Sequence, residues 1–465
     1  MTRHLTPVDT AFLALESSAR PMHAGVLLLL DPPPGADPAA LVERIHTAFR
    51  AAGPAVFPWN ARAVFGLGLP RWETVEVDID YHLRRLRLPL PGTTTQLMEL
   101  LSHVYSGPLD HSRPLWEAYL VDGLASGQVG IFIKAHHAMF DGVRGARLFY
   151  ESFSETPDDD PRPVWVMRSG ADERRPAPGG GGAGGVGTAL RRVAGIAGVA
   201  PQLARLVPDA VRLARSGSAV PWTAARTPTM AEQISSARSF AFFDLPLDEV
   251  RAVGRRFGGT INDVVLSVCD DAMHRYLAED NGTVNGAGSP GRLVAMMAVS
   301  TRRAGDESGN ASTAVLVPLG APEASPAERL ARIVEVTSSI KSEVRRSSTL
   351  SLQLQLLMVV SGMELRERLP VARGSAPLLS NFVVSNVPGP EEPRYLGGAK
   401  LAGFYPLPIV TGSQAANFTM LPVHTSLCVG IGAARNLLHD TSRLADLALD
   451  SFAALRDSAH RKDSA

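Results

Sequence analysis

The chain has 465 residues, of which 45% are hydrophobic and 20% charged, so it can bury large cores and does not have the composition of a disordered protein. Its 46 basic and 46 acidic side chains cancel, which leaves no overall positive field for nucleic acid. The two cysteines form no CxxC pair, and neither a signal peptide nor an apolar run long enough to span a membrane is evident. These features favour a cytoplasmic protein.

The first 155 residues alternate between helical and extended patterns. Residues 6–9, Thr-Pro-Val-Asp, have the cap, proline and acidic residue of a helix start. Apolar spacing predicts further helices at 39–50, 95–105 and 143–153. Apolar runs predict extended segments at 26–30, 75–81, 86–90, 118–121 and 129–135. We expect residues 1–155 to form one α/β domain.

A break in this pattern covers residues 156–187, which we interpret as a flexible linker rich in glycine and proline. Its glycine run contains a GxGxxG spacing, but prolines precede it and no strand leads into it, so a dinucleotide loop is not expected. We expect residues 188–238 to form an amphipathic helical connector, in which arginines alternate with apolar residues over the run 190–215. Two interpretations stay open for it: a helical hairpin packed on a domain, or a face that contacts lipid.

The second α/β region extends over residues 239–465. We expect helices at 247–257, 260–277, 326–345 and 442–455. Strands are expected at 241–245, 292–299, 314–319, 382–387 and 427–431. The similar make-up of the two regions predicts two layered domains of mixed α/β class.

Two adjacent histidines, His136 and His137, follow the apolar run 130–133 and precede an expected helix. Rigid strands commonly aim catalytic side chains from their ends. If the strand continues, the two rings point to opposite sides, so only one faces a given pocket. Asp141 could orient His137, and Gly142 permits a tight turn. A histidine with a carboxylate partner suits general-base chemistry near neutral pH.

The nucleophile is then the remaining question. No GxSxG elbow occurs in the chain, and neither cysteine has a catalytic neighbourhood. Direct attack of a substrate hydroxyl on an activated acyl group is therefore the simplest hypothesis. Two alternatives remain: a structural histidine pair, and a metal site, although the spacing of these residues lacks the usual zinc pattern.

Residues 136–142, His-His-Ala-Met-Phe-Asp-Gly, resemble the HHxxxDG signature of bacterial wax ester synthase/acyl-CoA:diacylglycerol acyltransferases. The narrower HxxxDG spacing resembles the wider superfamily of CoA-dependent acyltransferases. Further blocks of the same family are similar at 5–9, 21–23, 78–82, 90–92, 108–110, 113–117, 262–264, 309–310 and 385–390. Departures at 298–302 and 413–419 concern substrate preference more than chemistry.

The resemblance implies a fold of two chloramphenicol-acetyltransferase-like domains with an active-site tunnel between them. It implies that His137 is the general base, that Asp141 supports it, and that His136 is a neighbour of less certain role. Acyl-CoA would be the co-substrate, with diacylglycerol or a long-chain alcohol as acceptor. No metal or bound cofactor is implied, and the products would be triacylglycerol or wax ester.

Two of the similar blocks outside the histidine motif each allow a structural and a functional interpretation. Pro114, Leu115 and Trp116 either pack near the pocket or line the substrate channel. Asn262 and Asp263 either cap the helix that follows or line the acyl channel. Two other functions stay open: a non-catalytic lipid-surface protein of the same fold, and a transferase for a smaller alcohol or amine. Peripheral attachment to a membrane or lipid inclusion is compatible with each.

Overall fold

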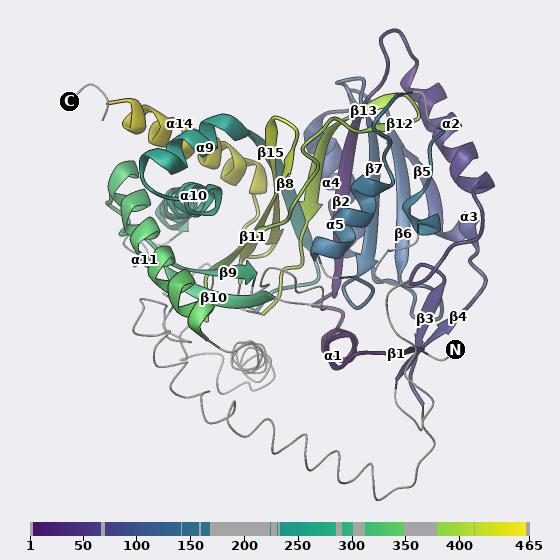
Figure 1. Cartoon of the computed structure of the whole chain (residues 1–465), viewed down its shortest axis with the longest axis horizontal. Coiled ribbons are helices and arrows are strands. Elements are labelled where there is room, and N and C mark those ends of the chain that lie inside the picture. The colour runs from purple at the N-terminus through teal and green to yellow at the C-terminus, as the bar shows by residue number, and fades with distance from the viewer. Residues whose placement is uncertain are drawn as a thin grey trace, which may run out of the picture.

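The computed structural model describes residues 3–66, 70–140, 142–157, 160–167, 224, 230, 233–284, 291–300, 312–347, 379–412 and 414–461. Within them, two six-stranded sheets and their helices lie side by side, which confirms the expected α/β class (Figure 1). Most of the expected linker and the whole of the amphipathic run 190–215 lie outside the described residues.

The first sheet has the strand order β12-β13-β2-β7-β6-β5. Only β5 and β6 pair in parallel, and the other neighbours are antiparallel. Its strands are β2 (His23–Asp31), β5 (Leu83–Arg87), β6 (Trp116–Asp122), β7 (Val129–His136), β12 (Tyr395–Leu396) and β13 (Ala399–Leu407). A small separate sheet contains β1 (Arg3–His4), β3 (Ala61–Val64) and β4 (Arg71–Thr74).

Strands β2, β6 and β7 are buried along almost their whole length, which explains their continuous apolar sequences. The helices of this half are α1 (Pro7–Leu15), α2 (Pro38–Ala51), α3 (Ile79–His82), α4 (Thr94–Ser106), α5 (Gly142–Glu151) and the 3-10 turn Val164–Val166. Helix α2 packs on β6 and β7, whereas α4 contacts β8 (Arg238–Pro246) of the other half. Helix α4, with one face buried, therefore joins the two halves.

The expected helix start at Thr6 is confirmed, because Thr6 and Asp9 form a reciprocal capping box. The extended segment expected at 75–81 does not form a strand: β4 ends at Thr74, residues 75–78 belong to no strand, and a helix begins at Ile79. Asp78 accepts a hydrogen bond from the Tyr81 N–H and starts the short helix α3 there. This local cap outweighs the alternating pattern that indicated a strand.

The second sheet has the order β10-β9-β11-β14-β15-β8. Strand β11 lies parallel to β9 and β14, and the remaining pairs are antiparallel. The strands are β8 (Arg238–Pro246), β9 (Val294–Ser300), β10 (Ser312–Pro318), β11 (Phe382–Asn386), β14 (Ala416–Val423) and β15 (Ser426–Ala434). Helices α9 (Leu247–Arg256), α10 (Ile261–Val284), α11 (Pro326–Arg346) and α14 (Thr441–Arg461) lie on the side of this sheet away from the first sheet (Figure 1).

Strand β13 belongs to the C-terminal region in sequence but to the first sheet in space. It pairs antiparallel with β2, from Lys400 opposite Asp31 to Leu407 opposite Gly25. Phe404 and Leu407 are buried in the N-terminal core. The region 239–465 therefore supplies strands to both sheets.

The two sheets also approach closely where β15 crosses β13. A Cβ atom added at Gly430 would lie 1.8 Å from the Pro406 carbonyl oxygen, so only glycine allows this approach. The buried Arg238 guanidinium spans the same region by donating to the carbonyl oxygens of Ala19 and Val410 at 3.0 and 3.2 Å. These contacts fix the halves against each other. Among the described helices, none combines the length and apolarity that a membrane crossing requires.

Candidate active site

The end of β7 carries His136 and His137, and backbone hydrogen bonds from both sides fix its position. The His136 N–H donates to the Leu115 carbonyl oxygen at 2.9 Å, and the His137 N–H donates to the Met22 carbonyl oxygen at 2.8 Å. The chain then turns, with the Met139 N–H donating to the His136 carbonyl oxygen. The strand thus ends between the two histidines.

The His137 ring is partly exposed and lies against helix α1. Its centroid is 4.4 Å from that of the Phe12 ring, with an interplanar angle of 27°. Stacking on one face restrains the ring while leaving it partly accessible. The helix that begins at the Thr6 cap therefore helps to orient this imidazole.

The His136 ring has the opposite environment. It is 1% exposed, and its Nδ1 accepts a hydrogen bond from the Ala138 N–H at 3.1 Å. Burial lowers the pKa of His136 to about 3, so the ring is neutral at neutral pH. With Nδ1 acting as acceptor, the proton of the neutral ring is on Nε2. His136 consequently has no free basic nitrogen to offer a substrate.

Glu16 connects the surroundings of both histidines. Its Oε2 is 2.6 Å from Nε2 of His111 and 3.7 Å from Nε2 of His136. Its Oε1 accepts a hydrogen bond from the N–H of Met22, whose carbonyl oxygen holds His137. Burial opposes ionisation of Glu16, but the hydrogen bonds and the nearby imidazoles lower its pKa below 4.5. The hydrogen bond to Glu16 raises the pKa of His111 above 6.5.

A further buried histidine, His23, lies opposite His136 in the β2–β7 register. Its Nε2 is 2.7 Å from the Tyr105 carbonyl oxygen, while the Tyr105 hydroxyl donates to the His23 carbonyl oxygen at 2.5 Å. Burial lowers the pKa of His23 to about 4. His23 and His136 are thus neutral, buried and hydrogen-bonded rings on neighbouring strands at the end of β7.

The block at 114–116 is structural in its contacts. Leu115 and Trp116 are 1% and 0% exposed, and the Leu115 carbonyl oxygen holds the His136 N–H. The Trp116 indole N–H donates to the Trp59 carbonyl oxygen at 2.8 Å. Pro114 is buried beside them. The block therefore anchors the strand end from below.

The neighbouring residues Asn262 and Asp263, at the start of α10, make different side-chain contacts. Asp263 accepts hydrogen bonds from the N–H and hydroxyl of Thr260 at 2.8 and 2.7 Å, which is a helix cap. Asn262 instead lines a pocket of the C-terminal half. Asp141 lies outside the described residues, and Gly142 is the first residue of α5.

Three residues of the site were not anticipated as functional from the sequence: Phe12, Glu16 and His111. Glu16 and His111 are 95 positions apart, so no local pattern links them. Phe12 follows the periodicity of α1, but that pattern does not reveal that its ring meets His137.

Comparisons with known proteins agree with this architecture. The model of the wax ester synthase/diacylglycerol acyltransferase catalytic domain matches residues 5–265, and that of the C-terminal domain matches residues 308–456. The chain is 37% identical to a putative diacylglycerol O-acyltransferase of Mycobacterium bovis, over 99% of this chain and 97% of that protein. A probable diacylglycerol O-acyltransferase of Mycobacterium tuberculosis matches to the same extent.

Solved structures extend the comparison to the fold. The wax ester synthase/diacylglycerol acyltransferase of Marinobacter aquaeolei is similar with a TM-score of 0.75 and 27% identity, over 98% of this chain and 100% of that one. The first condensation domain of the calcium-dependent antibiotic synthetase shares the fold, with a TM-score of 0.56, 18% identity, and coverage of 99% and 96%. The expected two-domain chloramphenicol-acetyltransferase-like fold is confirmed. The chain belongs to the wax ester synthase/diacylglycerol acyltransferase family and is an acyltransferase enzyme.

Proposed function

We propose that this enzyme transfers a long-chain fatty acyl group from acyl-CoA to the free hydroxyl of diacylglycerol, with His137 as general base. One observation carries the choice of base: of the two adjacent rings, only His137 is accessible, while His136 is buried with Nδ1 already engaged. Relatives named as diacylglycerol O-acyltransferases over nearly the whole chain support this acceptor.

The proposed reaction is a single direct transfer. His137 takes the proton from the acceptor hydroxyl, whose oxygen attacks the thioester carbonyl carbon. The tetrahedral intermediate collapses, the carbon–sulfur bond breaks, and the departing CoA thiolate takes the proton back from His137. The step balances with two substrates and one histidine, so it calls for no bound cofactor and no acyl-enzyme. Holding both substrates together supplies much of the acceleration.

The supporting residues have roles in this proposal that follow from their contacts. Glu16 and Met22 hold the backbone of His137, and Phe12 holds its ring. Asp141 would support the loop, as the family resemblance implies. Leu115 and Trp116 are buried, which favours an anchoring role over contact with substrate.

A long-chain alcohol is the second candidate acceptor, because the family also includes wax ester synthases. Either lipid must be reached at a membrane or lipid inclusion, so we propose peripheral contact with such a surface.

The test is an acceptor panel with radiolabelled palmitoyl-CoA. Purified wild-type protein is assayed with dioleoylglycerol, hexadecanol and a short-chain alcohol, and His137→Ala is assayed in parallel. We expect labelled triacylglycerol as the main product and its loss in His137→Ala, with an unchanged unfolding midpoint. Transfer only to the short alcohol, or lipid binding without transfer, would reject the proposal in favour of the smaller-acceptor enzyme or the non-catalytic lipid-surface protein.

A further inference from the structure

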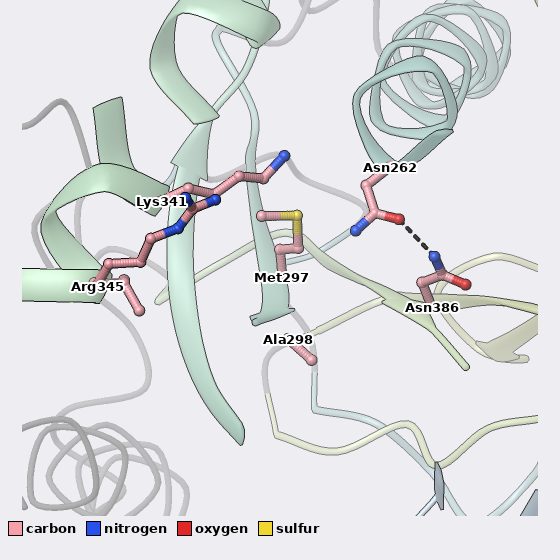
Figure 2. Close-up of a pocket in the computed structure, with 7 residues that line it drawn as sticks. Asn262, Met297, Ala298, Lys341, Arg345 and Asn386 are labelled. Atoms are coloured by element: carbon pink, nitrogen blue, oxygen red, sulfur yellow. Dashed lines mark hydrogen bonds between the residues drawn. The ribbon is translucent and has the colours of Figure 1, made fainter. Parts of the chain in front are cut away.

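A pocket of about 320 Å³ lies in the C-terminal half, where the first turn of α10 faces the last turns of α11 (Figure 2). Strands β9 and β11 contribute its other walls. Its lining residues are Asn262, Met297, Ala298, Lys341, Val344, Arg345 and Asn386. They come from four elements distant in sequence, so the pocket exists only in the folded chain.

The charge of this pocket is positive. Lys341 and Arg345 lie one helical turn apart on α11; in Figure 2 the Arg345 side chain reaches toward the base of Lys341, whose ammonium points on toward Asn262. Among the described residues that line the pocket, none carries a carboxylate. The Lys341 Nζ is 3.3 Å from Asp263 Oδ1, so part of its charge is balanced. Arg345 is exposed, and among the described residues no carboxylate pairs with it. The guanidinium is therefore available to an anion.

Two neutral amides complete the polar side. The Asn386 Nδ2 donates to Asn262 Oδ1 at 2.7 Å, a bond drawn in Figure 2. This leaves an amide N–H pair on Asn262 and the carbonyl oxygen of Asn386 for a ligand. The first turn of the 24-residue helix α10 adds a partial positive charge nearby. Met297, Ala298 and Val344 provide an apolar wall.

We propose that this pocket binds the phosphorylated nucleotide end of acyl-CoA. The inference rests on the proposed function in one respect: of its two substrates, diacylglycerol is uncharged and only acyl-CoA carries phosphates. A positive recess with amide groups and an apolar wall matches a ligand in which phosphates adjoin an amide chain and a base. The planar guanidinium of Arg345 can donate two parallel hydrogen bonds to a phosphate, and Lys341 adds a second positive charge.

Binding of CoA measured by calorimetry tests the inference without requiring turnover. We compare wild type, Arg345→Gln and Arg346→Gln, whose replaced side chain is also exposed and lies on the same turn but outside the pocket. The Kd of CoA should rise roughly tenfold in Arg345→Gln, as for one charge-assisted contact, and stay unchanged in Arg346→Gln. 3′,5′-ADP should show the same dependence on Arg345, whereas pantetheine, which has no phosphate, should show none.

Turnover then separates this inference from the proposed function. In Arg345→Gln we expect a raised KM for palmitoyl-CoA with kcat retained. Equal CoA affinity in the three proteins would overturn the pocket assignment even if the wild type makes triacylglycerol. Weaker binding of Arg345→Gln to phosphatidylglycerol vesicles, with CoA affinity unchanged, would also overturn it and assign the pocket to lipid phosphate. Absence of acyl transfer alone would reject the function but leave the calorimetric result to decide the pocket.

Discussion

The end of β7 lies in one half of the molecule and the pocket between α10 and α11 in the other. The buried histidines around the first are neutral, whereas the second is lined by cationic side chains. At β7, burial removes the charge of His136 and His23 and leaves one accessible imidazole, His137. At the pocket, the Arg345 side chain is exposed, and Lys341 is partly exposed with its Nζ 3.3 Å from Asp263 Oδ1. A neutral imidazole can accept a proton, whereas fixed cations can only hold an anion. In our two proposals, the N-terminal half supplies the general base and the C-terminal half holds the phosphates of acyl-CoA.

The largest expected effect separates these two sites. His137→Ala should lower kcat by roughly 10²- to 10⁴-fold, the usual contribution of a general base. Its CoA affinity should stay within about twofold of wild type, because the cationic pocket is untouched. Single-turnover kinetics and calorimetry measure the two effects. If His137→Ala lost CoA affinity as severely as turnover, catalysis and CoA binding would not belong to separate sites.

The second prediction concerns stability of the C-terminal half. Arg329 is 1% exposed and pairs with the fully buried Asp270, which also accepts a hydrogen bond from the Gly320 N–H at 2.9 Å. Arg329→Met removes the guanidinium from this buried carboxylate, which keeps the Gly320 N–H and the His274 ring 3.0 Å from its Oδ1. The loss should cost about 3–5 kcal/mol of unfolding free energy. Arg332→Met, on the same helix but 47% exposed, should cost less than about 1 kcal/mol. Urea unfolding followed by circular dichroism compares them, and equal midpoints would refute the difference.

The third prediction tests Glu16 as a positioning residue. Glu16→Gln should lower kcat about three- to tenfold, since the Glu16 carboxylate accepts the N–H of Met22, whose carbonyl oxygen holds the His137 N–H, and also pairs with His111. KM for palmitoyl-CoA should not change. His111→Gln, which breaks the pair but leaves the Glu16–Met22 bond, should have a smaller effect on kcat. If His111→Gln lowered kcat more than Glu16→Gln, the Glu16–Met22 hydrogen bond would not be the contact that positions His137.

The same pair predicts a pH dependence of stability. His111 has a raised pKa in the folded protein, so its contribution is full below 6.5 and is lost as pH rises through the folded value. Glu16 has a lowered pKa, so its contribution is full above 4.5 and is lost as pH falls through the folded value. The stabilisation is therefore complete from pH 4.5 to 6.5, and about 1 kcal/mol or less because His111 is half exposed. The difference in unfolding free energy between wild type and Glu16→Gln should be largest in that window.

The smallest expected effect is that of Phe12→Leu. Replacing the stacked ring should lower kcat about two- to tenfold, the range for one aromatic contact, with no change in CoA affinity. Leu15→Met on the same helix serves as the control. An effect on CoA affinity instead of kcat would show that α1 acts at the nucleotide and not at the imidazole.

Local features of the chain could be predicted because they depend on neighbours in sequence. The capping box at Thr6, the buried runs of β2 and β7, and the adjacent histidines at a strand end are all visible in short stretches. The expected strand at 75–81 was wrong: residues 75–78 form no strand, and the Asp78 side chain caps a short helix from Ile79.

The family and the identity of the histidine pair were thus determined by the sequence itself, through a motif and blocks in fixed order. Tertiary structure alone decided that β13 joins the sheet of the other half, that Glu16 meets His111, and that Asn262 and Asn386 meet across a cationic pocket. The physical reason is sequence distance: strand pairing and side-chain contacts between remote segments depend on how whole layers pack, which local periodicity does not encode. Burial, which makes His136 neutral and leaves His137 accessible, follows from that packing as well.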